Sequence, residues 1–388
     1  MANTDGTSFV LDNADARGNV VDWSITNDTL GIPGDFTFSV RKRTLHGGRQ
    51  EGVTLIEVNN GHLALSVIPT RGMSVLRVRA GDVTLGWDSP VKEIVHPAFI
   101  NLQARGGLGW LDGFNEMLVR GGYEWSGHPG MDGDRLLTLH GRAGNTPASR
   151  VEVAVDPEPP HRIRVRGRVL ETTFKFADYE MWTEISTVPG SAAFRVSDRL
   201  TNQGDYEREF QILYHGNFGP PLLEENAEFV APVREVAPFN EYAAGGLDAW
   251  TTYRGPTPHF DEQAYAILPY ADAENRTTAM LRNAAADRGV ALRFGVDELP
   301  CLTLWKNTDT LKQGYVTGLE PGSGFPYNRA VEREAGRVPK LAPGASREFT
   351  LDYAVLSDRA QVAAVADEVA AIRDGRDTRV RTEPPVPR

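Results

Sequence analysis

The stretch HRIRVRGRVLETTF, residues 161–174, carries apolar side chains at alternate positions. Ile163, Val165 and Val169 are separated from one another by arginines or glycine. A period of two places the apolar side chains on one face of a β-strand and the charged ones on the other. One buried face and one solvated face are typical of an antiparallel sheet. The stretch therefore predicts a half-buried strand in an antiparallel β-structure.

Similar short runs occur on both sides of this stretch, separated by Asn, Gly and Asp residues. They include TLIEVNN (54–60), HLALSVIPT (62–70), SVLRVRAG (74–81), VTLGWDS (83–89), CLTLWKN (301–307) and SREFTLDYAVL (346–356). Many strands at close spacing, with no internal repeat and no dividing linker, favour one large sandwich. We therefore predict an all-β fold, built as a large antiparallel sandwich.

The clearest helical signal lies near the C-terminus. The run DRAQVAAVADEVAAIRDG (358–375) is rich in alanine, has apolar residues at helical spacing, begins after Ser357 and stops at Gly375. It predicts a short C-terminal helix. We accordingly expect an N-terminal extension packed on the sandwich over residues 1–50, a sandwich domain over 51–357, and a helix with a tail over 358–388.

Composition limits the classes of partner. The 388-residue chain has a net charge of -11, which argues against nucleic acid and anionic membranes, because both favour basic surfaces. No run approaches the roughly 18 apolar residues that span a bilayer, and the N-terminal residues lack the features of a signal peptide. We expect a cytoplasmic protein that binds neither nucleic acid nor membrane. The single cysteine, Cys301, excludes an intramolecular disulfide and lies in an apolar run typical of buried packing.

Three stretches place a titratable side chain where a predicted strand meets a loop. They are LLTLHGRAGNTPA (136–148) with His140, FQILYHGNFGPP (210–221) with His215, and GYVTGLEPGSGFPYNRA (314–330) with Glu320. Binding and catalytic groups often occupy such positions, because a rigid scaffold holds them while loops surround the ligand.

These residue types suit proton transfer. Histidine changes protonation near neutral pH, and a glutamate acts as a base once its surroundings set its pKa. An imidazole and a carboxylate on opposite sides of a substrate form an acid and base pair. The alternative is that each of these side chains has only a structural role at its strand end. For any one of the three residues, the sequence favours the structural and the functional role about equally.

The order of these motifs resembles the galactose mutarotase (aldose 1-epimerase) superfamily. The resemblance spans roughly residues 50–356 and includes Asn202 at a strand end, His215 followed by Asn217, Glu320 followed by Pro321, and the LAPG turn at 341–344. The LHGR segment at 139–142 is similar to an earlier HG motif of that family. PTRGM, WLDGFNE and HGRAGNTPA are similar to a branch known only as aldose 1-epimerase-like.

The resemblance implies a β-supersandwich catalytic domain with its site on one concave face. It implies that Glu320 removes the proton of the anomeric hydroxyl while His215 protonates the ring oxygen of a small-molecule sugar or sugar derivative. His140 would bind or polarise the ring oxygen or a neighbouring hydroxyl. No cofactor is required by this chemistry.

The family motif is usually HGG, whereas Arg142 follows Gly141 here. A sugar-phosphate branch of the superfamily also uses arginines, so Arg71, Arg105 and Arg142 are candidates to bind an anionic substrate. The alternative is that these arginines pair with carboxylates such as Asp112 or Glu116.

Other candidate substrate-binding residues lie nearby in the sequence. Aromatic residues could stack on a sugar face, and polar ones could bond its hydroxyls; the candidates are Trp110, Phe114, Trp125, Asp112, Asn115, Asn217 and Lys306. Imidazole and carboxylate also suit divalent metals. The two histidines lack the tight spacing of a metal motif, so a metal site from His140, His215 and Glu320 is the less favoured alternative, and we expect no metal.

Three functions fit this sequence. The first is a mutarotase-type isomerase, and the second is another proton-transfer enzyme, such as an epimerase or lyase, acting on a modified or oxidised sugar. The third is a carbohydrate-binding protein without turnover. A matched acid and base favour an enzyme. No feature of the sequence selects a particular sugar or oligomeric state, because the fold does not determine either.

Overall fold

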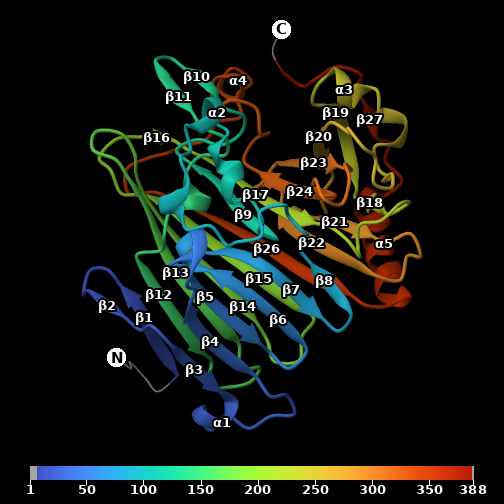
Figure 1. The fold of residues 1–388 in the computed structure, drawn as a ribbon. Helices are drawn as coiled ribbons and strands as arrows, with labels where there is room; N and C mark the ends of the chain where they lie inside the picture. Colours follow the sequence, from blue (N-terminus) through green and yellow to red (C-terminus); the bar gives the residue numbers. More distant parts are fainter. Residues whose placement is uncertain (1–6, 387–388) are drawn as a thin grey trace.

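The computed structural model describes residues 7–386 and contains two large β-sheets packed face to face (Figure 1). The ten-stranded sheet has the order β18 (Glu228–Val230), β21 (Arg276–Arg282), β22 (Gly289–Gly295), β26 (Ser346–Leu356), β15 (Ala193–Asn202), β14 (Asp178–Thr187), β13 (Ile163–Thr172), β12 (Arg150–Val155), β1 (Ser8–Asn13), β2 (Gly18–Asn19).

The thirteen-stranded sheet has the order β27 (Arg379–Val380), β19 (Val233–Pro238), β20 (Gln263–Pro269), β23 (Cys301–Asn307), β24 (Val316–Gly322), β17 (Gln211–Phe218), β9 (Leu118–Tyr123), β7 (Ser74–Ala80), β6 (Leu63–Ile68), β5 (Thr54–Asn59), β4 (Ser39–Thr44), β3 (Trp23–Thr26), with β8 (Val83–Leu85) beside β7. Neighbouring strands in both sheets run antiparallel, apart from the parallel pair β19 and β27. The predicted all-β antiparallel sandwich is confirmed.

Smaller elements lie around the two sheets. Two short ribbons pair β10 (Gly130–Asp132) with β11 (Arg135–Leu137) and β16 (Arg208–Glu209) with β25 (Lys340–Leu341). The helices are α1 (Asn27–Leu30), α2 (Ala104–Gly107), α3 (Glu241–Ala244), α4 (Arg329–Glu334) and α5 (Arg359–Arg373). The 3-10 turns are η1 (Gly48–Gln50), η2 (Pro69–Arg71), η3 (Pro97–Phe99), η4 (Gly109–Gly113), η5 (Ala143–Asn145) and η6 (Leu247–Ala249).

Strand β13 shows why the alternating sequence forms this sheet. Ile163, Val165 and Val169 are buried between the two sheets. The arginines between them lie on the outer face, where Arg164 pairs with a carboxylate of the preceding turn and Arg166 with one of β14. Apolar burial on one face and solvated charge on the other therefore fix the side of β13 that faces the core.

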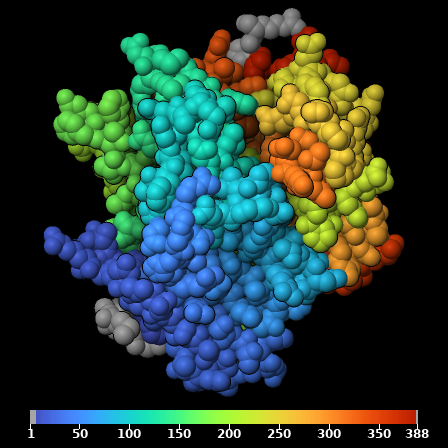
Figure 2. Space-filling model, in the orientation of Figure 1, coloured from blue at the N-terminus to red at the C-terminus, as the bar shows by residue number. Residues whose placement is uncertain are grey.

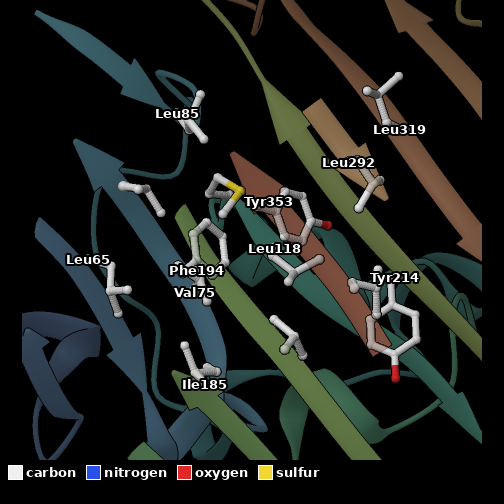
Figure 3. Close-up of a cluster of buried hydrophobic side chains, with 14 of the residues drawn as sticks. Leu65, Val75, Leu85, Leu118, Ile185, Phe194, Tyr214, Leu292, Leu319 and Tyr353 are labelled. Atoms are coloured by element: carbon white, nitrogen blue, oxygen red, sulfur yellow. The ribbon is translucent and has the colours of Figure 1, made fainter. Parts of the chain in front are cut away.

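The core lies between the sheets and receives side chains from both (Figure 3). Leu118 and Leu319 come from the thirteen-stranded sheet, and Ile185 comes from the other. Phe194 and Tyr353, from adjacent strands β15 and β26, stack with ring centroids 4.9 Å apart. Burial of this large apolar area supplies the main driving force for the packing of the two sheets.

A buried ion pair crosses the core. Arg120 of β9 pairs with Asp198 of β15 in the opposite sheet, and both side chains are fully buried. The hydroxyl of Tyr214 on β17 donates to the same carboxylate at 2.8 Å, and Arg120 also donates to the carbonyls of Gly72 and Met73. This cluster links β9 and β17 of one sheet to β15 of the other.

Helix α5 confirms the predicted C-terminal helix. The side chain of Asp358 caps its N-terminus by accepting from the backbone N–H of Gln361 at 2.8 Å. Val362 and Val365 pack against Met280 of β21. In the described residues, no helix is both long and apolar enough to cross a membrane.

Replacing Asp198 with asparagine should destabilise the protein strongly, because it leaves the guanidinium of Arg120 buried without its counter-charge. We expect a loss of about 3–5 kcal/mol in the free energy of unfolding, measured by urea titration. Asp88→Asn is the control, since that exposed carboxylate pairs with Lys92 at the surface and should cost about 0–1 kcal/mol. Equal costs for the two variants would contradict a structural role for the buried pair.

Candidate active site

His215 and Glu320 lie opposite each other on neighbouring strands. Strands β17 and β24 pair with Leu213 opposite Gly322 and Gly216 opposite Leu319, so the register places His215 beside Glu320. Tyr214 and Leu319, each next to one of these residues, point into the core (Figure 3). Because side chains alternate along a strand, His215 and Glu320 project from the other face of the sheet.

The two side chains form a close buried pair. Nε2 of His215 lies 3.2 Å from Oε1 of Glu320, and only a few per cent of either side chain is exposed. The contact is not aligned as a hydrogen bond, since Oε1 of Glu320 has no hydrogen-bond partner in the protein. Nδ1 of His215 is also buried without a partner. Each side chain of the pair therefore has a polar atom that makes no hydrogen bond within the protein.

Burial sets the protonation of this pair. It lowers the pKa of His215 to about 3, and Asn217 only partly offsets this effect. Burial, together with the negative charge of Glu262, raises the pKa of Glu320 well above its usual range. Both shifts favour the uncharged form of the group concerned, the neutral imidazole of His215 and the protonated carboxyl group of Glu320.

His140 is held beside the pair by an unusual backbone conformation. Its φ is +52°, its N–H donates to the carbonyl of Gly127 at 2.9 Å, and its carbonyl accepts from Gly122 at 2.9 Å. Gly141 follows with a φ of +70°, and a Cβ there would lie 2.2 Å from the carbonyl oxygen of Trp125. The HG segment therefore needs a glycine after the histidine.

The His140 ring lies close to that of His215, with their centroids 5.4 Å apart. Burial and the neighbouring His215 lower the pKa of His140 well below its usual range. Both imidazoles are therefore neutral at physiological pH, and each can accept one hydrogen bond and donate another.

Aromatic side chains surround the His215 ring. The centroid distances are 5.8 Å to Trp110, 5.2 Å to Phe114 and 5.5 Å to Trp305. Figure 2 shows a cleft between the cyan to teal segment near residues 90–130 and the yellow to orange segment near residues 240–310. Trp110 and Phe114 belong to the first segment and Trp305 to the second, so the His215 ring lies between side chains of these two segments.

Several buried polar atoms around the pair have no partner. They are Nδ1 of both histidines, Oε1 of Glu320, Nε1 of Trp110 and Oγ1 of Thr303. Thr303 of β23 lies opposite Glu320 in the sheet register and projects from the same face. Buried polar groups are usually hydrogen-bonded, so this set is suited to a ligand that carries several hydroxyl groups.

Two of the candidate arginines pair with carboxylates. Arg71 is buried against Glu116 at 2.7 Å and also donates to the carbonyls of Val95 and Gly113. Arg105 forms a more exposed ion pair with Asp112. Neither guanidinium contacts His215 or Glu320. Both arginines instead pair with carboxylates, as the alternative interpretation of the sequence predicts.

Arg142 and the two asparagines also have other contacts. Arg142 donates to Thr173 at 3.1 Å and lies over the Trp125 ring at 4.9 Å. Asn115 donates to the backbone carbonyls of residues 91 and 93. Asn217 donates to the carbonyls of Glu116 and His215 and so supports the backbone of β17.

Lys306 lies on the opposite face of β23 from the pair. Its ammonium donates to the carbonyls of residues 249, 250 and 252. The neighbouring Trp305 faces His215 instead, and its Nε1 donates to Glu262 at 2.8 Å. Thr303, Trp305 and Glu262 were not among the sequence candidates, although the alternation in CLTLWKN places Thr303 and Trp305 on one face.

Other features of the molecule lie outside this cleft. Over residues 7–386, no group of three or more His, Cys, Asp or Glu side chains is arranged to hold a metal ion. Cys301 is buried, and burial raises the pKa of its thiol to about 12. A cavity of about 630 Å³ lies on the ten-stranded sheet and is lined by Trp182, Arg166 and Arg199 among others.

Comparisons with known proteins are consistent with this fold. Residues 50–355 match the model of a domain of unknown function, DUF4432. A crystal structure from Klebsiella pneumoniae subsp. pneumoniae MGH 78578, of a protein provisionally named aldose 1-epimerase, is 49% identical with a TM-score of 0.96, covering 98% of this chain and 99% of that one. No curated protein matches the sequence.

More distant structures share the fold alone. A galactose mutarotase-like protein from Clostridium acetobutylicum is 13% identical with a TM-score of 0.55, covering 82% of this chain and 98% of that one. A galactose 1-epimerase from Lactobacillus acidophilus NCFM is 12% identical with a TM-score of 0.50, covering 82% and 99%. The 49% identical relative confirms the resemblance to aldose 1-epimerase-like proteins, and the distant structures confirm the shared fold.

Gly141→Ala should destabilise the protein, because the added methyl group overlaps the Trp125 carbonyl. Gly133→Ala is the matched control, since Gly133 also has a positive φ of +60° but no atom lies within 4 Å of the place that a Cβ would occupy there. We expect Gly141→Ala to cost about 1–3 kcal/mol more than the control in urea unfolding. Equal costs would show that the close contact at Gly141 is not a constraint.

Proposed function

The chain belongs to the DUF4432 family, and from the geometry of its buried His–Glu pair we propose that it is a carbohydrate isomerase of the aldose 1-epimerase type. The observation that carries the proposal is the buried contact between His215 and Glu320 among unpartnered polar atoms. An acid and a base in contact suit two proton transfers to adjacent oxygens of one substrate. The 49% identical relative that bears the aldose 1-epimerase name supports the same activity.

The proposed reaction balances one proton removed against one delivered. Glu320 as carboxylate takes the proton from the anomeric hydroxyl, and Nε2–H of His215 gives its proton to the ring oxygen. The bond between the anomeric carbon and the ring oxygen breaks as the carbonyl forms. Rotation about the adjacent carbon–carbon bond and the reverse transfers then close the other anomer. His140 would hold the ring oxygen or a neighbouring hydroxyl.

The proposed reaction requires the pair to carry one proton. Burial raises the pKa of Glu320 and lowers that of His215, so these shifts favour Glu320 as the group that holds it before a sugar binds. Movement of the proton across the 3.2 Å contact gives a carboxylate and an imidazolium. Hydroxyl groups of a bound sugar would stabilise this charged form, because hydrogen bonds to a carboxylate favour its ionised state.

The contacts of the arginines favour an uncharged sugar over a phosphorylated one. Arg71 and Arg105 pair with carboxylates, and Arg142 contacts Thr173 and Trp125. Glu262, which accepts from the indole N–H of Trp305, would repel an anion. We therefore propose a free sugar as substrate.

Glu320→Gln and His215→Asn should each slow anomer exchange by about 10²–10⁴-fold, because each removes one partner of the acid and base pair. Exchange is measured by NMR or polarimetry across a panel of free sugars. Glu348→Gln, at an exposed position on β26, is the control and should leave the rate unchanged.

The outcomes separate the candidate functions. Turnover that survives Glu320→Gln would show that Glu320 is not the base. If no sugar is turned over yet one raises the melting temperature, the protein binds carbohydrate without catalysis. Formation of a product other than the second anomer would identify a different proton-transfer reaction on the same site.

Trp110→Phe should weaken sugar binding, because it keeps an aromatic ring but removes the unpartnered Nε1 donor. One lost hydrogen bond predicts an increase in KM of roughly three- to tenfold with kcat little changed. Steady-state kinetics measure both constants. An unchanged KM would show that the indole N–H does not contact the substrate.

A further inference from the structure

Glu171 is a buried carboxylate that the proposed chemistry does not use. It lies near the end of β13 and points into the sandwich, with 4% of its surface exposed. Oε2 accepts from the backbone N–H groups of Tyr123 and Glu124, at 3.3 and 3.2 Å. Oε1 has no hydrogen-bond partner. A buried carboxylate with an unpaired oxygen is costly, so its presence calls for a functional reason.

The backbone that Glu171 holds also holds His140. Gly122 directly precedes Tyr123, donates its N–H to the carbonyl of His140 at 2.9 Å, and accepts at its own carbonyl from the N–H of Arg142 at 3.2 Å. The carboxylate of Glu171 thus accepts hydrogen bonds from one end of a short segment, Tyr123 and Glu124. At the other end of this segment, Gly122 bonds to the backbone on both sides of Gly141, which includes that of His140.

Charged and titratable groups face Glu171 from several elements. Burial and the nearby Glu124 raise its pKa, Arg142 and the two backbone N–H groups lower it, and the net result is a pKa of about 7. Glu124 itself pairs with Arg135 at 2.6 Å. The groups around the carboxylate are Tyr123, Glu124, Arg135, Arg142 and Tyr179.

We propose that Glu171 is a positioning residue for His140. Ionisation of its carboxylate strengthens the backbone hydrogen bonds that fix the position of the His140 imidazole. The ionised form accepts the Tyr123 and Glu124 N–H groups more strongly than the neutral form does. The firm position of His140 in turn keeps its imidazole beside His215. This inference rests on the proposed function, because it requires His140 to contact the sugar.

The stability change caused by this carboxylate has a definite sign. Its pKa is raised from about 4.5 to about 7 by folding, so between these values the folded state binds more protons than the unfolded state. Stability attributable to Glu171 therefore decreases as pH rises through this window, and the ionised form is a net cost above pH 7. A carboxylate whose only role is to stabilise the fold would instead have a lowered pKa, and its contribution to stability would increase as pH rises.

Glu171→Gln tests the proposal, because glutamine keeps the shape and an acceptor oxygen but cannot ionise. In the wild type, kcat/KM for anomer exchange should rise as pH increases through about 7. His215, with a pKa of about 3, cannot produce that rise, and any effect of Glu320 ionisation is common to the wild type and the variant. The variant should lack the component of the rise near pH 7 and be about tenfold slower at pH 8. Its melting temperature at pH 8 should equal or exceed that of the wild type.

Matched variants make the result specific. Glu171→Asp retains a titrating carboxylate and should keep a rise in rate at a shifted pH, while Glu348→Gln should change neither the profile nor the melting temperature. A Glu171→Gln variant that keeps the rise near pH 7, or that only loses stability, would overturn the positioning role. If the wild type exchanges no anomer at any pH, the proposed function fails instead, so the two failures are distinguishable.

Discussion

The pairing of β17 with β24 is the constraint on which the cleft depends. Its register sets His215 opposite Glu320 on one face of the sheet, while Tyr214 and Leu319 enter the core on the other. A shift of one residue would exchange these faces and bury the titratable pair between the sheets. The hydroxyl of Tyr214 bonds to Asp198 in the opposite sheet, so core packing and the position of the acid and base pair are set by the same strand.

Burial then determines the chemistry that the pair can perform. Aromatic rings from two distant segments enclose His215 and exclude water, and this enclosure moves the pKa of His215 down and that of Glu320 up. These opposite shifts favour Glu320 as the holder of a shared proton, and in the proposed reaction a bound sugar moves that proton to His215 and back within one turnover. The cost of burying these groups is offset by the large apolar core beneath them.

Much of this arrangement was predictable from local sequence, because strands follow from alternation and His215 and Glu320 belong to strands that end in turn residues. For the arginines, the sequence offered Asp112 and Glu116 as possible partners but did not decide between such pairing and the binding of an anionic substrate. Arg71 meets Glu116 only because strands and loops 45 residues apart converge, and sequence spacing carries no such information. Lys306 is different: alternation within CLTLWKN places it on the face opposite Trp305, and this pattern could have removed it from the candidates. The sequence around Glu171 gave no indication of its proposed role, because that role depends on contacts with a segment far away in the chain.

A structure of the protein with a sugar bound tests the central claim most directly. The account predicts the sugar in the cleft beside Trp110 and Trp305, with its anomeric oxygen within hydrogen-bond distance of Glu320 and its ring oxygen near Nε2 of His215. The unpartnered oxygen of Thr303 should bond to a hydroxyl group. A sugar bound elsewhere, for example in the cavity on the ten-stranded sheet, with His215 and Glu320 still in mutual contact and untouched, would contradict the account.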